Sequence, residues 1–244
     1  MSAPDWLTAR PIAHRGLHDA AHGIIENTTS SIAAAIAGNY AIETDLQITA
    51  DGDAMVHHDD ALGRLTDGNG ALASMTAAEL KRVSFRATAD RMMTFGDLCD
   101  LVGGRIAMFI ELKSHFDRDE RLVRRTAEVL ASYAGPVAVM SFDPRMVADL
   151  RRHAPHLVRG VDAERHFGGS TVSAWHRYVL AHLLHAPATR PDFVSYRVDD
   201  LPAPATTLTR RLGLPVVAWT VRTPEQRRRS EEFTDQMIFE GFRP

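Results

Sequence analysis

The chain has 244 residues, of which 45% are hydrophobic and 24% are charged, and its formal net charge is -3. This composition is typical of a folded globular chain and excludes a disordered one, while the small net charge argues against polyanions, so we expect no nucleic-acid partner. The single cysteine excludes an internal disulfide. The first residues lack the pattern of a secretory signal, and no apolar run approaches the roughly 18 residues of a membrane span. We therefore expect a cytoplasmic protein with no stable membrane insertion and a small-molecule partner.

Eight short apolar and β-branched runs alternate with segments of helical spacing along the chain. The runs are 10–14, 41–46, 106–112, 137–141, 157–161, 193–196, 216–220 and 236–239. This alternation is typical of parallel strands joined by crossover helices, and eight repeats favour a closed (β/α)8 TIM barrel over an open sheet. Barrels of this length commonly fold as one unit, so we assign residues 1–244 to one domain.

Punctuation residues locate several helix boundaries. Asp143 before Pro144 predicts an N-cap followed by the first helical residue, and the segment from Thr223 to Gln226 has the spacing of a capping box. A helix is expected from about Arg118 to the glycine and proline at 135–136. Residues 46–106 are too many for one crossover, which predicts a small insertion after the second strand, approximately 47–93. Few residues follow the eighth run, so the last helix is expected to be reduced or absent.

Two pairs of charged residues end predicted strands. Glu43 and Asp45 are one residue apart and therefore share a strand face, and Glu111 and Lys113 repeat this spacing. In a barrel the carboxyl ends of the strands converge, and three carboxylates are costly to bury together unless a cation neutralises them. Oxygen ligands of this kind select Ca²⁺, Mg²⁺ or Mn²⁺. For either pair alone a solvated strand end or an ion pair is the favoured interpretation, but two pairs with one spacing reverse that preference and favour a metal site.

Histidines suited to proton transfer follow two predicted strands. His14 comes directly after the first, and His57 and His58 lie in the expected insertion. Adjacent residues in an extended chain face opposite ways, so only one of His57 and His58 is expected to enter the site. Other histidines, including His18 and His166, are assigned to the surface or to packing.

Two cations complete a coherent site for a phosphate ester. The planar guanidinium of Arg15 and the ammonium of Lys113 are both suited to the nonbridging oxygens of a phosphodiester. Together with a metal ion that polarises the phosphate and histidines that transfer protons, these residues predict phosphoester cleavage. They do not identify the alcohols on either side of the phosphorus.

Seven short motifs follow one another along most of the chain. They are His14-Arg15-Gly16, Glu26-Asn27-Thr28, Glu43-Thr44-Asp45, His58-Asp59, Glu111-Leu112-Lys113, Ser141-Phe142 and Trp219-Thr220-Val221. In this order they resemble the bacterial glycerophosphodiester phosphodiesterase family, and the combination is far more specific than any one motif. The resemblance implies a (β/α)8 barrel with a small insertion after the second strand.

The same resemblance implies roles for individual residues. One divalent cation, Ca²⁺ or Mg²⁺ with Mn²⁺ as a further candidate, would be held by three ligands. Other residues of the motifs would transfer protons and bind the phosphate and the rest of the substrate. Of the two adjacent histidines the resemblance selects His58, because Asp59 follows it. Trp219 is equally compatible with packing at the rim. The implied sets are catalytic His14 and His58, substrate-binding Arg15, Lys113 and Trp219, and metal-binding Glu43, Asp45 and Glu111.

Several positions depart from the family pattern. Ile25 replaces a common proline, Leu65 a threonine and Arg222 an asparagine, and residues 239–242 replace the usual Thr-Asp near the end of the barrel. Because the changed loops are expected to line the alcohol pockets, they bear on the substrate more than on the chemistry. The resulting hypothesis is hydrolysis of a glycerophosphodiester to glycerol 3-phosphate and an alcohol. The alternatives are a phospholipase-like lyase that releases a cyclic phosphate and a noncatalytic phosphate-binding barrel.

Overall fold

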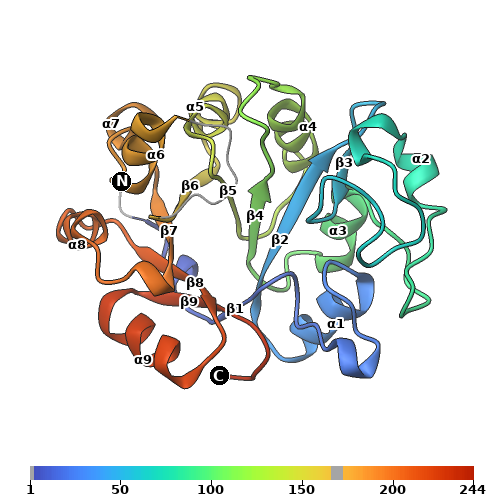
Figure 1. The fold of residues 1–244 in the computed structure, drawn as a ribbon, viewed down its shortest axis with the longest axis horizontal. Helices are drawn as coiled ribbons and strands as arrows, with labels where there is room; N and C mark the ends of the chain where they lie inside the picture. Colours follow the sequence, from blue (N-terminus) through green and yellow to red (C-terminus); the bar gives the residue numbers. More distant parts are fainter. Residues whose placement is uncertain (1–2, 166–172) are drawn as a thin grey trace.

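Eight parallel strands close into a barrel in the computed structural model, which describes residues 3–165 and 173–244 (Figure 1). His166 lies outside the described residues. The strands are β1 (Ile12–Ala13), β2 (Ala41–Ile48), β4 (Met108–Leu112), β5 (Val137–Ser141), β6 (Val158–Ala163), β7 (Phe193–Arg197), β8 (Val216–Val221) and β9 (Gln236–Phe239). The ring closes because β1 pairs with both β2 and β9.

Every strand expected from the sequence is present, so the predicted (β/α)8 barrel is confirmed. The first strand is shorter than the expected run 10–14. Arg15 and Gly16 adopt left-handed backbone conformations, with φ of 54° and 78°, and turn the chain away from the strand direction. Gly16 is required at this turn because a Cβ there would collide with Ser31, which lies in the helix Thr29–Ala37.

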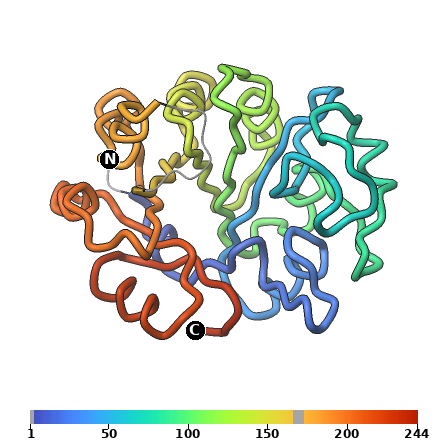
Figure 2. The backbone as a smooth tube through the Cα atoms, viewed as in Figure 1, coloured from blue at the N-terminus to red at the C-terminus, as the bar shows by residue number. Residues whose placement is uncertain are grey.

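Helices surround the barrel on its outside (Figures 1 and 2). They are α1 (Thr29–Ala37), α3 (Phe95–Val102), α4 (Arg121–Leu130), α5 (Pro144–His153), α6 (Ala174–Ala181), α7 (Ala186–Thr189), α8 (Pro204–Arg211) and α9 (Pro224–Phe233). Both predicted caps are confirmed: the Asp143 carboxylate accepts a hydrogen bond from the Arg145 N–H at 2.9 Å, and Thr223 and Gln226 form a capping box. The helix expected from about Arg118 begins at Arg121 instead, because Arg118 has a φ of 69° that no α-helix accommodates.

The predicted insertion lies between β2 and α3 and forms a small lobe beside the barrel (Figure 1). It contains β3 (Ala54–Val56), antiparallel to β2, a 3-10 turn (Leu72–Ser74) and α2 (Ala77–Leu80). Its apolar side chains form a cluster of their own around Met55, Leu72 and Leu80. The lobe therefore holds the loop after β3, which carries His58, at a fixed place beside the barrel mouth.

Residues 240–244 after β9 contain no helix. None of the described helices is long and apolar enough to cross a bilayer.

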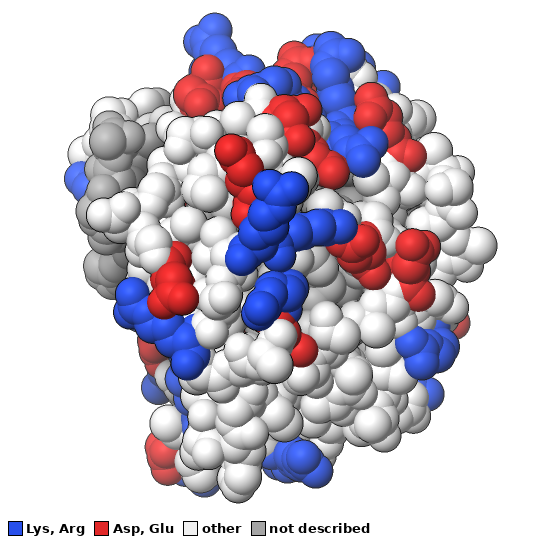
Figure 3. Space-filling view, turned by 90° about the vertical axis from the view of Figure 1, so that its right-hand side faces the viewer, with Lys and Arg blue, Asp and Glu red and all other residues white. Residues whose placement is uncertain are grey.

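On the face shown in Figure 3, basic and acidic side chains lie next to one another, which is consistent with the small net charge.

The barrel interior is filled by one face of each strand. Ile12, Ala41, Phe109, Phe193 and Val217 belong to a buried cluster that is separate from the larger cluster under the helices. Phe109 and Phe193 meet edge to face, with ring centroids 5.7 Å apart. Because side chains alternate along a strand, the residue two positions after each of these lies on the same face, one step nearer the carboxyl end of the barrel.

We expect Gly160→Ala to destabilise the fold by about 1–3 kcal/mol, because overpacking a filled core forces its neighbours to move. Gly160 lies on β6, and a Cβ there would lie 2.3 Å from Cζ of Phe193, whose ring also meets Phe109 edge to face. Urea unfolding would measure the change. Gly96→Ala in α3 is the matched control, since its Cβ would meet only Thr94 Oγ1 at 3.8 Å. Equal midpoints for the two variants would contradict the packing argument.

Candidate active site

A cavity of about 360 Å³ opens at the carboxyl ends of the barrel strands. Seven of the eight predicted site residues line it, namely His14, Arg15, Glu43, His58, Glu111, Lys113 and Trp219. The eighth, Asp45, is fully buried and contacts the cavity-lining Lys113, so the structure brings all eight together. His57 is also buried but does not line the cavity, and its backbone N–H donates to the Asp45 carbonyl.

The three predicted metal ligands form one acidic cluster. Glu43 and Asp45 come from β2 and Glu111 from β4, and Asp45 and Glu111 are register partners. One carboxylate oxygen from each lies within 4.8 Å of the others. A cation between these oxygens would have three hard ligands on rigid strands, and the remaining positions would open toward the cavity. The donor set therefore fits a single divalent cation.

Two basic side chains enter the acidic cluster. Lys113 Nζ lies 2.7 Å from Asp45 Oδ1 and 2.8 Å from Glu111 Oε1. Arg15 Nε lies 3.4 Å from Asp45 Oδ2, and the Arg15 backbone N–H donates to Glu43 Oε2 at 3.1 Å. Asp45 is thus held between both cations, whereas Glu43 accepts the Arg15 backbone hydrogen bond and lies 3.9 Å from His14 Nε2.

The acid/base properties of the three carboxyls diverge for this reason. Burial raises the pKa of Glu43 well above its ordinary range, and the neighbouring Asp45 and Glu111 raise it further. Burial also raises the pKa of Glu111, with Lys113 opposing. At Asp45 the effect of burial is outweighed by Lys113 and Arg15, which hold its pKa below the ordinary range. The cluster therefore places three carboxyl groups beside two cations, and a bound metal ion would favour the ionised form of all three.

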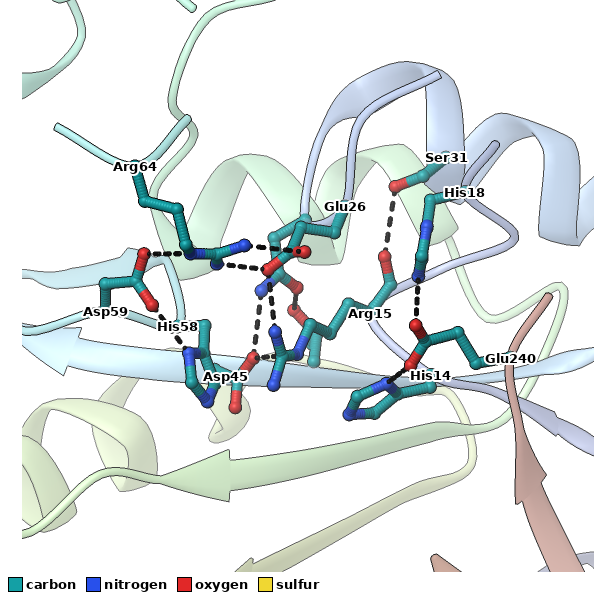
Figure 4. Close-up of polar contacts among 12 residues, drawn as sticks. His14, Arg15, His18, Glu26, Ser31, Asp45, His58, Asp59, Arg64 and Glu240 are labelled. Carbon is teal, nitrogen blue, oxygen red and sulfur yellow. Dashed lines mark hydrogen bonds and ion pairs between the residues drawn. The ribbon is translucent and has the colours of Figure 1, made fainter. Parts of the chain in front are cut away.

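Each candidate catalytic histidine has a carboxylate at Nδ1 (Figure 4). His14 Nδ1 lies 2.7 Å from Glu240 Oε2, and His58 Nδ1 lies 2.8 Å from Asp59 Oδ1. Since a carboxylate only accepts, both Nδ1 atoms carry the proton and both Nε2 atoms are free for other work. His14 Nε2 lies 3.9 Å from Glu43 Oε2, which directs this nitrogen toward the acidic cluster. Burial lowers the pKa of His14 although Glu240 opposes it, so its imidazole is neutral near pH 7.

A chain of ion pairs links the insertion to the first loop (Figure 4). Arg64 contacts Asp59 at 2.6 Å and Glu26 at 2.6 Å, and Glu26 contacts Arg15 at 2.7 Å. Burial opposes the effect, but Arg64 and Arg15 lower the pKa of Glu26 to about 2. The chain connects the His58 partner Asp59 to the phosphate candidate Arg15, so it fixes the lobe and the first loop relative to one another.

Asn27 supports the acidic cluster from below. Its side-chain amide donates to Asp45 Oδ2 at 2.9 Å and accepts from the Thr44 hydroxyl at 2.6 Å. A supporting role was the favoured interpretation of Glu26 and Asn27 over direct chemistry, with helix capping as the alternative, and their contacts give both a positioning role.

Several cavity residues were not identified from the sequence. Asp162, Ser195 and Arg197 line the side formed by β6 and β7, and their only local signal was the two-residue strand alternation. Glu240 and Arg222 appeared only as departures from the family pattern. They pair with one another at 2.7 Å, and Glu240 is the partner of His14.

The fold and the site define a class of (β/α)8 barrels in which carboxylates, histidines and cations meet at the carboxyl ends of the strands. Residues 14–239 match the model of the Glycerophosphoryl diester phosphodiesterase family, and the chain belongs to this family.

Two curated relatives match part of the chain. It is 29% identical over 162 residues to a glycerophosphodiester phosphodiesterase of Caldanaerobacter subterraneus subsp. tengcongensis. This alignment covers 62% of this chain and 65% of that protein. It is 25% identical over 151 residues to glycerophosphodiester phosphodiesterase 1 of Homo sapiens, which covers 58% of this chain and 45% of that protein. The alignments thus span less than two thirds of either relative.

Two solved structures share the fold over nearly the whole chain. An Oleispira antarctica phosphodiesterase, in complex with the product sn-glycerol-3-phosphate, has a TM-score of 0.79 at 20% identity and covers 98% of this chain and 95% of that one. A solved structure from Agrobacterium tumefaciens has a TM-score of 0.78 at 24% identity and covers 95% of this chain and 92% of that one.

The carboxylate partner of His14 gives a spectroscopic prediction. In the native protein ¹⁵N-edited NMR should detect the Nδ1–H tautomer of His14, and Glu240→Leu should lose this preference because the acceptor is gone. His58 is the internal control, because Asp59 still accepts from its Nδ1 in the variant. An Nε2–H tautomer of His14 in the native protein would contradict the geometry.

Proposed function

We propose that this protein hydrolyses glycerophosphodiesters to glycerol 3-phosphate and an alcohol, with one divalent cation held by Glu43, Asp45 and Glu111. The observation that carries the proposal is the convergence of three buried carboxylates, two cations and two histidines on one cavity. Membership of the family supports the same activity, as does the product complex of the Oleispira antarctica phosphodiesterase.

The cation, when bound, would polarise a phosphoryl oxygen and offset the negative charge of the phosphodiester. Ca²⁺ and Mg²⁺ suit an all-oxygen donor set, with Mn²⁺ a further candidate. The ligands stand on β2 and β4, so they need little rearrangement to hold it.

Arg15 and Lys113 bind the nonbridging oxygens of the substrate in this proposal. Both now contact Asp45, Arg15 at 3.4 Å and Lys113 at 2.7 Å. Where a divalent cation shared the carboxylates, Arg15 and Lys113 would have N–H donors available for the phosphate oxygens. Arg15 lies in the loop after β1 and Lys113 directly after β4, so they reach the phosphate from separate elements.

The histidines divide the proton transfers between them. His14 is neutral and keeps a free Nε2 lone pair, so we assign it as the base that takes the proton of the attacking oxygen, from water or a neighbouring substrate hydroxyl. His58, held through Nδ1 by Asp59 in the insertion, is assigned as the acid: in its doubly protonated form it gives the Nε2 proton to the leaving alcohol. A noncatalytic phosphate-binding site would not need this pair.

A panel of glycerophosphodiesters, assayed with purified, metal-reconstituted protein, tests the activity. Phosphorus NMR should detect glycerol 3-phosphate as the accumulating product. A cyclic phosphate that accumulates instead would contradict the hydrolytic endpoint and favour a lyase. Binding of every diester without turnover would favour the noncatalytic barrel.

Removal of the metal gives a direct prediction. Exhaustive chelation should abolish turnover, and addition of Ca²⁺, Mg²⁺ or Mn²⁺ should restore it, because the acidic cluster repels an anionic phosphodiester without a cation. Initial rates on one glycerophosphodiester measure both steps. Full activity in the chelated protein would eliminate the metal from the proposal.

The histidine assignment predicts a ranking of variants. His14→Ala and His58→Ala should each lower kcat by roughly 10² to 10⁴-fold, because each removes one proton transfer. His57→Ala is the matched control and should have a much smaller effect, since His57 does not line the cavity. A larger loss for His57→Ala than for His58→Ala would contradict the proposed roles.

A further inference from the structure

A second group of side chains that can bind a metal lies beside the acidic cluster. Among the described residues two groups have ligand atoms close enough to hold one ion: the acidic cluster, and the group formed by His14, His18 and Glu240. The members of the second group come from both ends of the chain, since the two histidines follow β1 and Glu240 follows β9. The pairing of β1 with β9 that closes the barrel therefore also assembles this group.

Glu240 stands between the two imidazoles (Figure 4). Its Oε2 lies 2.7 Å from His14 Nδ1, and its Oε1 lies 3.9 Å from His18 Nε2. Ligand atoms about 2.0–2.2 Å from a tetrahedral zinc ion are roughly 3.3 Å from one another. The two separations lie on either side of that value, so small side-chain movements would bring the three ligands to one ion. Arg222 contacts Oε2 at 2.7 Å, which leaves Oε1 for an ion that also reaches His18.

The group is held in place and borders a cavity of its own. The exposed fractions of the side chains are 12% for His14, 17% for His18 and 24% for Glu240, so their positions are restricted by the surrounding protein. His14 lines the active-site cavity, whereas His18 and Glu240 line a second cavity of about 640 Å³. An ion can therefore reach the group from the second cavity, and water there can fill its remaining coordination position.

The donor set of this group differs from that of the acidic cluster. Two imidazole nitrogens and one carboxylate oxygen are ligands of open zinc sites, in which water takes the fourth position. Three carboxylates favour the hard cations Ca²⁺, Mg²⁺ and Mn²⁺ instead. The two neighbouring groups are therefore suited to different ions, and a hard cation in excess would leave the histidine group open to zinc.

An ion bound to this group acts on the nitrogen that orients His14. Without the ion, Nδ1 carries the proton and Nε2 the lone pair, because Glu240 accepts from Nδ1. Zinc binds the Nδ1 lone pair of a neutral imidazole, so the ring proton moves from Nδ1 to Nε2 and the charge of the ring is unchanged. Nε2 then has no lone pair with which to accept a proton from the attacking oxygen.

We propose that His14, His18 and Glu240 form a zinc site, separate from the site of the catalytic cation, and that zinc bound there inhibits the protein by placing the His14 proton on Nε2. The binding of zinc is independent of any activity. The inhibition rests on the proposed function, because it assumes that His14 Nε2 is the catalytic base.

Calorimetry with Zn²⁺, in excess Ca²⁺ and without substrate, tests the site. The native protein should bind one zinc ion, and His18→Asn should weaken this binding by roughly 10²-fold, because a zinc site divides its affinity among few ligands. His22→Asn is the matched control, since His22 follows β1 as well but pairs with Asp19 outside the group. Equal zinc affinity in the native protein and His18→Asn, or zinc binding that disappears as Ca²⁺ is raised, overturns the site.

The tautomer of His14 gives a second readout that a merely structural His18 would not change. In ¹⁵N-edited NMR, zinc should move the His14 proton from Nδ1 to Nε2 in the native protein and in His22→Asn. The same zinc concentration should leave it on Nδ1 in His18→Asn. An Nδ1–H tautomer of His14 in the zinc-saturated native protein overturns the site.

Initial rates, each expressed relative to the zinc-free rate of the same variant, separate this inference from the proposed function. In His18→Asn the zinc concentration that halves the rate should rise by roughly 10²-fold, in parallel with the binding. If no diester is hydrolysed but zinc binds and moves the proton, the zinc site stands and the hydrolase proposal fails. If diesters are hydrolysed and zinc neither binds nor slows the reaction in excess Ca²⁺, the hydrolase stands and the zinc site fails.

Discussion

Side-chain alternation along closed parallel strands is the constraint on which the site depends. On β4, Phe109 fills the barrel interior, and Glu111 and Lys113 follow on the same face at steps of two residues. The same step leads on β2 from Ala41 to Glu43. The apolar layer that closes the barrel thus determines where the polar layer above it points. A slip of one residue in register would turn these side chains toward the outer helices.

Electrostatic imbalance is the second feature that shapes the site. Asp45 is satisfied by Lys113, Arg15 and Asn27, while burial and neighbouring acids raise the pKa of Glu43. Such a cluster costs folding energy when it stands alone and repays it when a cation binds. The surrounding ion pairs, including that between Arg64 and Glu26, hold the groups in place without neutralising the cluster itself.

Much of this arrangement could be predicted, because its signals are local. Two acids two residues apart at the end of a strand share a face, as Glu43 and Asp45 do on β2. Glu111 on the neighbouring β4 joins them in one cluster. The partner of His14 was not predictable in the same way. Glu240 lies 226 positions away and was visible only as a replacement of a common residue. Asp162 and Ser195 have no local signal, because a polar residue on a strand looks alike whether it faces solvent or a cavity.

The sequence by itself determined the eight strands, their alternation and therefore which side chains share a face, since these depend on periodicity within a few residues. It also determined the chemical character of the acidic cluster. The Asp59 that follows His58 already favoured this histidine over His57, and His58 lines the cavity. Only the tertiary structure decided which carboxylate holds His14. The reason is the closure of the ring: β1 pairs with β9, which brings His14 to Glu240, and no local preference encodes a contact that forms only when the two ends of the barrel meet.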